Sequence, residues 1–380
     1  MNIIMVSMKK CILALIPFLL FACTPASKDE IKNLKFVEKG DVKMSNLVRD
    51  YSLIRLETQE NNLIADATMV HVWNNRIFIL DTYSTNKGVY VFGMEGEYIG
   101  RIGGVGQGPG EYIFPVSMSI DKEGNKLIVK DGAKNRLLFY SLSDYTCLEE
   151  INIPFYSNCV EYLAPNRLIW YVGSGCANVG EDTKHIQITD MKATPISRHM
   201  NRENLPKRGL YNVSTYFHGI NDEMYFHHPF SNEMYCYDIE TDSVRMRYIL
   251  QWDGLTFPSK EYVVRNSEDI VNQLKQDGYI SFYDIHENSE RLLCYFGAGK
   301  DKYIGVYNKK QREGFYTNIE DIEDDLGLLK YVRPKSIYND SFVSVVYTEE
   351  LDKLKENSIL YPLLKEVDSD GGNPIVVIYK

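Results

Sequence analysis

Short runs of β-branched and aromatic residues recur along the chain and are separated by polar loops. Six of these runs share one register: Ile77–Asp81, Leu127–Asp131, Leu168–Val172, Met224–His228, Leu292–Phe296 and Phe342–Val346. Their ends lie 50, 41, 56, 68 and 50 residues apart. Most are followed by a polar turn and a second run of the same kind, as in Gly88–Phe92 and Tyr303–Tyr307. This pattern is typical of β-hairpins and predicts a repeated all-β unit.

The spacing of the repeats indicates the architecture. A four-stranded propeller blade takes roughly 40–50 residues, so six blades need about 300. Residues 50–57 alternate apolar and polar positions ahead of the first repeat, and an unpaired strand at either end of the ring would invite aggregation. We therefore predict an all-β fold, a six-bladed β-propeller over residues 35–380. We expect it to be closed by pairing of 50–57 with the C-terminal run Ile375–Tyr379.

Two stretches interrupt the β pattern. Residues 259–276 place apolar side chains on or near one helical face, and Gly278 follows as a stop signal. Residues 349–367 also have a helical pattern, which is broken near Pro362. We predict both as short helical insertions that cover one face of the propeller.

The N-terminus has a pattern of its own. Two lysines at 9–10 precede an uncharged apolar run over residues 11–22. This run is too short to span a bilayer, since spanning needs about 20 residues. A basic start followed by a short apolar run is typical of a signal peptide. The run ends in Leu-Phe-Ala-Cys, which resembles the bacterial lipobox. We predict a signal peptide over residues 1–22 and a lipid anchor on Cys23.

A polar tether is predicted to follow over residues 23–34, before the propeller. Its segment Ser27–Glu30 resembles the acidic export signals of surface-exposed lipoproteins, and it is equally consistent with a solvated linker. The chain is thus expected to be an outer-membrane lipoprotein. Whether it faces the periplasm or the cell surface stays open.

The net charge narrows the classes of partner. A net charge of −10 argues against nucleic acid, whose binding depends on neutralisation of phosphates by Lys and Arg.

Beyond Cys23 the cysteines are odd in number and scattered, at Cys147, Cys159, Cys176, Cys236 and Cys294. No disulfide framework or zinc motif is predicted from this spacing. We expect buried apolar cysteines, with a Cys159–Cys176 bridge as the alternative.

A glycine-rich segment at Gly103–Gly110 has no following Lys-Ser or Lys-Thr and precedes a strand rather than a helix. A tight turn between blades is therefore predicted, not a phosphate cradle. With Pro115, Asp121, Gly124, Asp131, Asn135 and Arg136 behind it, this stretch resembles an NHL-type propeller repeat. Together with the lipidated start and the closing Asn373-Pro374 strand, the chain resembles the bacterial six-bladed β-propeller lipoprotein family. That resemblance implies the fold and transfers no catalytic residues.

Four residues are candidates for ligand binding. Asp81, Asp131 and His228 hold equivalent places at the ends of their strands, near one face of the predicted ring. They either converge on a ligand at the central channel or cap the following turns. Arg136, by the same resemblance, serves the neighbouring hairpin loop. His218 is placed to join His227 or His228 across a hairpin. The sequence predicts no metal site, although calcium or zinc in the central channel is left open.

No catalytic signature is present, since the chain has neither a GxSxG nor an HExxH motif. We therefore predict a membrane-anchored binding module for a glycan, a peptide or an envelope protein, with no catalytic residues. The alternative is a lyase or hydrolase that uses channel-facing Asp and His, with or without a metal. A structural subunit of a larger envelope complex is the third hypothesis.

Overall fold

A computed structural model shows how the chain is folded. It describes residues 31–157, 159–172, 184–201, 217–220, 223–228, 230–259, 261–263, 265, 270–328, 333–347, 358–364 and 372–380. These residues belong to one compact unit, Ile31–Lys380. Within the described residues, no helix has the length and apolar character needed to cross a membrane.

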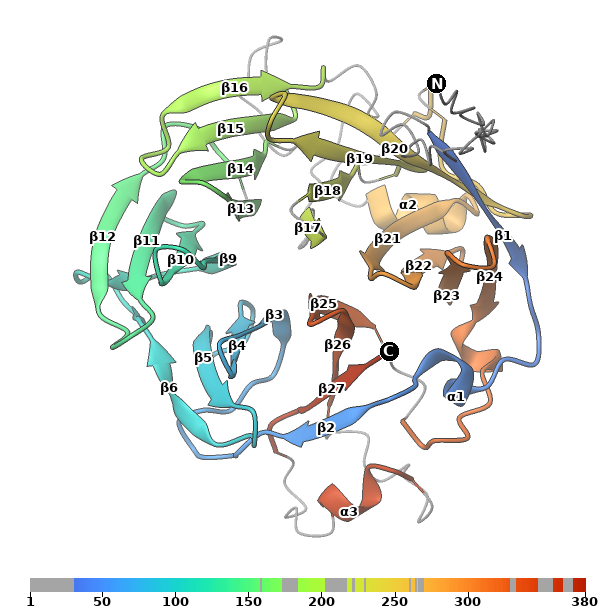
Figure 1. Ribbon diagram of the computed structural model, residues 1–380, viewed down its shortest axis with the longest axis horizontal. Coiled ribbons are helices and arrows are strands. Elements are labelled where there is room, and N and C mark those ends of the chain that lie inside the picture. Colours follow the sequence, from blue (N-terminus) through green and yellow to red (C-terminus); the bar gives the residue numbers. More distant parts are fainter. Residues whose placement is uncertain are drawn as a thin grey trace, which may run out of the picture. The chain divides into compact units, whose positions relative to one another are not determined.

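Four-stranded antiparallel blades surround a common centre (Figure 1). Blade 1 comprises β3 (Ala67–Trp73), β4 (Arg76–Asp81), β5 (Gly88–Gly93) and β6 (Tyr98–Ile102); blade 2, β9 (Pro115–Asp121), β10 (Lys126–Asp131), β11 (Arg136–Ser141) and β12 (Cys147–Asn152); blade 3, β13 (Cys159–Leu163), β14 (Arg167–Tyr171), β15 (Ile186–Asp190) and β16 (Pro195–His199). Blade 4 comprises β17 (Phe217–Ile220), β18 (Glu223–His227), β19 (Glu233–Asp238) and β20 (Ser243–Trp252); blade 5, β21 (Ile280–Glu287), β22 (Arg291–Ala298), β23 (Asp301–Asn308) and β24 (Glu313–Asn318); blade 6, β25 (Pro334–Tyr338), β26 (Ser341–Val346), β27 (Ile375–Tyr379) and β2 (Ser52–Arg55). The described residues thus form the predicted six-bladed β-propeller.

Each of the six sequence runs is the second strand of a blade, as the shared register predicted. The alternating apolar side chains of these strands are buried between neighbouring blades. Phe78 and Val89 of blade 1, for example, pack in one cluster with Met118, Leu127 and Val129 of blade 2. The hydrophobic core is therefore a set of layers between blades, and the inner strands are left to line the centre.

The ring is closed as predicted, by antiparallel pairing of β2 with β27 in which Ser52 lies opposite Ile378. A further strand, β1 (Lys32–Glu38), was not predicted. It pairs in parallel with the outer strands of two blades, β20 and β24, and joins blades 4 and 5 into one nine-stranded sheet. Its alternating Leu34 and Phe36 are buried. Among the described residues, regular structure thus begins three residues before position 35.

The first helical insertion is shorter than predicted. Helix α2 covers Ile270–Gln276, and the described residues within 259–265 are not helical. Instead, the side chain of Gln273 forms hydrogen bonds with backbone groups of this segment. Its Oε1 accepts from the N–H of Arg265 at 2.7 Å, and its Nε2 donates to the carbonyl of Val263 at 2.8 Å. These side-chain hydrogen bonds therefore take the place of the backbone hydrogen bonds that a helix would make in this segment.

The second insertion contains helix α3 (Tyr361–Leu364). Pro362, where a break was predicted, lies inside this helix, in the first turn, where proline is tolerated. The flanking 349–357 and 365–367 lie outside the described residues. Helix α3 lies outside the ring beside β2, where Arg55 donates to the carbonyl of Leu363 at 3.1 Å (Figure 1). It therefore covers the rim rather than a face.

Three small elements complete the description. Helix α1 (Met44–Leu47) lies between β1 and β2, and the 3-10 turn η2 (Ile319–Asp321) follows β24. The short strands β7 (Gly104–Val105) and β8 (Glu111–Tyr112) pair in parallel at the two ends of the glycine-rich loop. That loop connects blades 1 and 2, as predicted.

Candidate functional site

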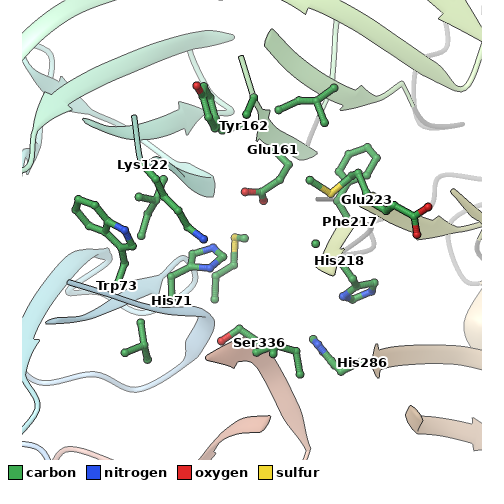
Figure 2. Close-up of a pocket in the computed structure, with 18 of the residues that line it drawn as sticks. His71, Trp73, Lys122, Glu161, Tyr162, Phe217, His218, Glu223, His286 and Ser336 are labelled. Carbon is green, nitrogen blue, oxygen red and sulfur yellow. The ribbon is translucent and has the colours of Figure 1, made fainter. Parts of the chain in front are cut away.

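A cavity of about 590 Å³ lies at the centre of the ring. Its lining residues include members of the innermost strand of every blade, β3, β9, β13, β17, β21 and β25. The wall is mixed: Met69, Trp73, Phe217 and Met224 are apolar or aromatic, and polar side chains lie between them (Figure 2). The volume and the mixed wall are typical of a small-molecule site.

The polar side chains hold equivalent positions in all six blades. In each blade, one inner-strand residue pairs with the second residue of the repeated run on the next strand. These six residues are His71, Ser119, Glu161, His218, His286 and Ser336. All are polar, and we call them the channel ring. Five of them line the cavity, and Ser119 lies behind Glu161 and donates to its carboxylate.

Glu161 is the carboxyl group of the channel ring, and its side chain points toward the cavity (Figure 2). Ser119 donates a short hydrogen bond to Glu161 Oε1, and the N–H of Tyr162 donates to Ser119 Oγ at 2.8 Å. Burial raises the pKa of Glu161 to about 7, against the lowering effect of these hydrogen bonds and of Lys122. The group therefore changes its protonation state near neutral pH.

The three imidazoles of the channel ring lie in a desolvated setting. Burial lowers the pKa of His71 to about 4 and holds the pKa of His218 well below its usual value. The rings of His218 and His286 meet edge to face, with centroids 4.6 Å apart. Among the described residues, Nε2 of each ring histidine and Oγ of Ser336 are buried without a hydrogen-bond partner. Nε2 of His286 lies 3.6 Å from Asp284 Oδ1, in an ion pair. Buried polar atoms normally have partners, so the other three atoms require an explanation.

Charged groups lie beside the channel ring in blades 5 and 6. Asp284 pairs with Arg333 at 3.2 Å. Burial raises the pKa of Asp284, but His286 and Arg333 outweigh that effect and hold the pKa well below its usual range. Burial and the neighbouring Arg333 lower the pKa of Lys335 to about 8. The negative charge of the Asp284 carboxylate is thus balanced by its ion pair with Arg333.

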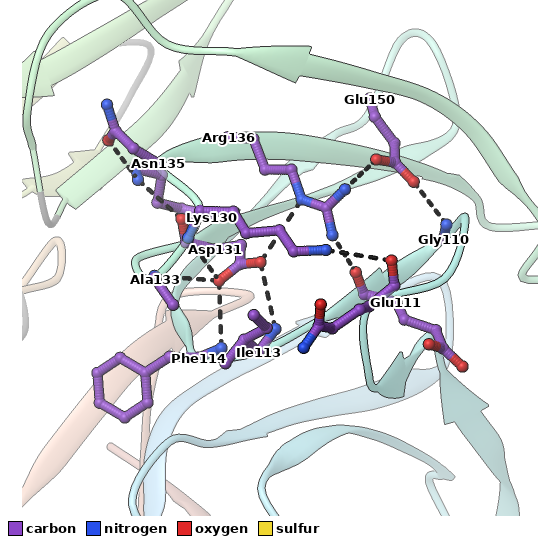
Figure 3. A network of polar contacts seen from close by, with 12 residues as sticks. Gly110, Glu111, Ile113, Phe114, Lys130, Asp131, Ala133, Asn135, Arg136 and Glu150 are labelled. Atoms are coloured by element: carbon purple, nitrogen blue, oxygen red, sulfur yellow. Dashed lines mark hydrogen bonds and ion pairs between the residues drawn. The ribbon is translucent and has the colours of Figure 1, made fainter.

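The strand-end aspartates have structural partners. Asp81 Oδ2 accepts from the N–H groups of Ala65 and Asp66 at 3.0 and 3.2 Å. Asp131 accepts from the N–H groups of Ile113, Phe114 and Ala133 at 3.2, 3.1 and 3.1 Å (Figure 3). Each aspartate therefore ties the entry segment of its own blade, and it also caps the turn after its strand, where Ser84 donates to Asp81 Oδ1 at 3.1 Å as Ala133 does to Asp131.

Arg136 fixes the glycine-rich loop to blade 2. Its guanidinium donates to the Glu150 carboxylate and to the carbonyl of Glu111, and its Nε lies 3.5 Å from Asp131 Oδ2 (Figure 3). Gly110 donates to Glu150 at 2.6 Å. Gly110 has φ +71°, and a Cβ there would lie 2.8 Å from Cys147 Cβ, so both conformation and space favour glycine. These contacts hold the loop that connects blades 1 and 2 against blade 2.

His228 lies apart from the channel ring, between blades 3 and 4. Its Nδ1 is 2.9 Å from the hydroxyl of Tyr171, and its ring centroid is 4.7 Å from that of His185. His227 points to the other side of the strand, where its ring stacks with that of His218 at 6.1 Å. Among the described residues, no hydrogen bond joins His228 to Asp81 or Asp131.

The described residues also bear on metal binding and on the cysteines. No three His, Cys, Asp or Glu side chains within the described ranges are grouped so as to hold a metal ion. Cys159, Cys236 and Cys294 are buried, as expected, whereas Cys147 on the outer strand β12 is exposed. Cys176 and the lipidation site Cys23 lie outside the described residues.

Comparisons with known proteins agree with this architecture. The family model described as DUF5128, 6-bladed beta-propeller, matches residues 23–344. A Bacteroides fragilis NCTC 9343 protein assigned as exported is similar in structure, with a TM-score of 0.80 and 23% identity over 92% of this chain and 99% of its own. A DUF4221 member from Bacteroides vulgatus ATCC 8482 has a TM-score of 0.55 and 11% identity over 87% and 96%. No curated protein matches the chain.

Proposed function

Because the chain belongs to the DUF5128 family of six-bladed β-propellers, we propose that it is an exported, lipid-anchored binding protein whose ligand occupies the central channel. The observation that carries this proposal is the channel ring. It presents three buried polar atoms without partners among the described residues, Nε2 of His71 and His218 and Oγ of Ser336, next to apolar and aromatic wall residues. A ligand that supplies the missing hydrogen bonds would offset the cost of burying them.

The site is tested by retention of ligands. The purified protein is dialysed against a mixed small-molecule library, and retained compounds are identified by mass spectrometry. We expect Ser336→Phe, which fills the cavity, to lose compounds that the wild type retains, while its melting temperature stays similar. Glu149→Gln, on the exposed outer strand β12, serves as the control and should retain them. Equal retention by wild type and Ser336→Phe would contradict a channel site.

The anchor is the second part of the proposal. Residues 1–22 would be removed, Cys23 acylated, and 23–34 would connect the lipid to the propeller. The lipobox-like sequence and the resemblance to propeller lipoproteins with NHL-like repeats support this assignment, and stable anchoring requires more than one acyl chain. We expect Cys23→Ala to leave the membrane fraction and Cys147→Ala, which removes an exposed cysteine, to stay in it. A Cys23→Ala chain that still sediments with membranes would contradict the anchor.

One observation favours an enzyme as the second candidate. Glu161 has its pKa raised to about 7, and a catalytic acid or base works best with a pKa near the operating pH. A lyase or hydrolase would then use Glu161 with the channel histidines. Retained compounds that are converted by the wild type but only bound by Glu161→Gln would favour the enzyme, and unchanged compounds would favour the binding protein.

A further inference from the structure

We propose that the ligand of the central channel is an uncharged, hydroxyl-rich molecule, a saccharide unit held at the level of the channel ring. This inference rests on the proposed function and specifies the chemistry of its ligand. It is carried by the distribution of polar atoms around the cavity, the balance of charge in its wall and its aromatic surfaces.

The polar atoms are distributed around the circumference of the cavity. His71, Glu161, His218, His286 and Ser336 come from five different blades at one register, and the labelled side chains surround a common space (Figure 2). A ligand with a polar group on one side would satisfy one sector of this arrangement. A sugar ring carries hydroxyl groups around its edge and can reach several sectors at once.

The channel ring contains both donors and acceptors. A neutral imidazole has one donating and one accepting nitrogen, and a serine hydroxyl does both. Glu161 accepts from Ser119 and, when protonated, can also donate. A ligand hydroxyl both donates and accepts, so it can pair with Ser336, with the carboxyl group and with either tautomer of the histidines.

The charge of the wall does not favour an ion. Its charged lining residues are two lysines, Lys122 and Lys335, and three glutamates, Glu123, Glu161 and Glu223. Neither sign is in clear excess. The burial that lowers the pKa values of His71 and His218 and raises the pKa of Glu161 would also disfavour an ionised ligand. The lysines can donate to hydroxyl oxygens.

The wall also offers aromatic surface. Trp73 and Phe217 line the cavity beside the polar residues. The C–H face of a sugar can pack on such rings while its hydroxyl edge bonds to the channel ring. Trp73 supplies a signal as well, because the other tryptophans, Trp170 and Trp252, are buried within and between blades.

The experiment uses tryptophan fluorescence and calorimetry of the purified protein at pH 7.5. The probes are glucose, galactose, N-acetylglucosamine, maltose and cellobiose, the matched acids glucuronate and galacturonate, and acetate and phosphate. We expect a neutral saccharide to bind and its matched acid to bind at least about tenfold more weakly, since loss of one net hydrogen bond corresponds to about tenfold in Kd. Ser336→Ala and Glu161→Gln should each weaken saccharide binding by a similar factor, and Glu149→Gln should not.

Other outcomes distinguish the saccharide inference from the proposed channel site. Tighter binding of an acid, acetate or phosphate that is lost in Ser336→Ala would overturn the saccharide inference and leave the channel site standing. Saccharide binding that neither ring variant changes would overturn placement at the channel ring. Absence of binding at millimolar saccharide would also overturn the inference, whereas the channel site is judged by the dialysis comparison with Ser336→Phe.

Discussion

The Asp131–Arg136 cluster at the entry of blade 2 and the channel ring are both buried polar clusters, yet they differ in their hydrogen bonding. Asp131 accepts from three backbone N–H groups within 3.2 Å and pairs with Arg136, which also binds Glu150. Three atoms of the channel ring, Nε2 of His71 and His218 and Oγ of Ser336, have neither a hydrogen bond nor an ion pair among the described residues. The contacts of the first cluster thus stabilise the fold, and no further role is needed to explain them. The second has unused capacity that an internal structural role does not explain.

The largest effect is expected in the satisfied cluster. Asp131→Ala would leave three backbone donors without their acceptor and would remove the ion pair of the buried Arg136, which keeps its bonds to Glu150 and to the carbonyl of Glu111. We expect a loss of about 3–5 kcal/mol in the free energy of unfolding, measured by urea denaturation. Asp144→Ala, which removes an exposed turn cap, should lose less than about 1 kcal/mol. Equal losses in the two variants would remove the distinction drawn between the clusters.

Glu161→Gln tests the channel ring through its pH dependence. Because the pKa of Glu161 is raised from 4.5 to about 7 in the folded protein, its ionisation opposes folding, and stability is lost as pH rises through that window. The variant should therefore gain up to about 3 kcal/mol relative to wild type between pH 4 and pH 8. Chemical denaturation at both pH values measures this difference. A difference that does not vary with pH would place Glu161 in a solvated setting.

His71→Gln should show the opposite sign. The pKa of His71 is lowered from 6.5 to about 4, so wild-type stability is lost as pH falls through that window. The variant should gain up to roughly 3 kcal/mol relative to wild type between pH 7.5 and pH 4, by the same denaturation measurement. In wild type the effects of Glu161 and His71 oppose each other between pH 4.5 and 6.5. The double variant tests this compensation. Its free energy of unfolding should depend on pH there as that of wild type does, and a steeper dependence would contradict the compensation.

The smallest effect concerns a pair of serines. Ser336 Oγ is buried without a partner among the described residues, so Ser336→Ala should leave stability unchanged or raise it by about 1 kcal/mol. Ser117 Oγ donates to the carbonyl of Val160 at 3.2 Å, so Ser117→Ala should lose about 1 kcal/mol. Thermal unfolding of the two variants compares an unused hydroxyl with a used one. The reverse order would contradict the contrast.

The blades could be predicted because their second strands carry strong alternation bounded by turn residues. Strand β1 could not, since only Leu34 and Phe36 in it are buried and its parallel partners lie far away in sequence. The strand-end aspartates are conspicuous in the repeats, but they cap turns. The channel ring was missed because the inner strands are less regular in sequence. A signal exists nonetheless: each ring residue precedes the second residue of its run by seven to nine positions, as with His71 and Phe78 or Ser119 and Ile128.

Strands β1 and β2 also bear on the order in which the molecule can assemble. They are synthesised ahead of the blades, yet their partners β20, β24 and β27 end at residues 252, 318 and 379. The pairing of β2 with β27, which completes blade 6, therefore cannot form until nearly the whole chain is available. Such distant pairings slow folding, because a long loop must close before any contact forms. In an exported protein, this delay would help to keep the chain threadable until translocation is almost finished.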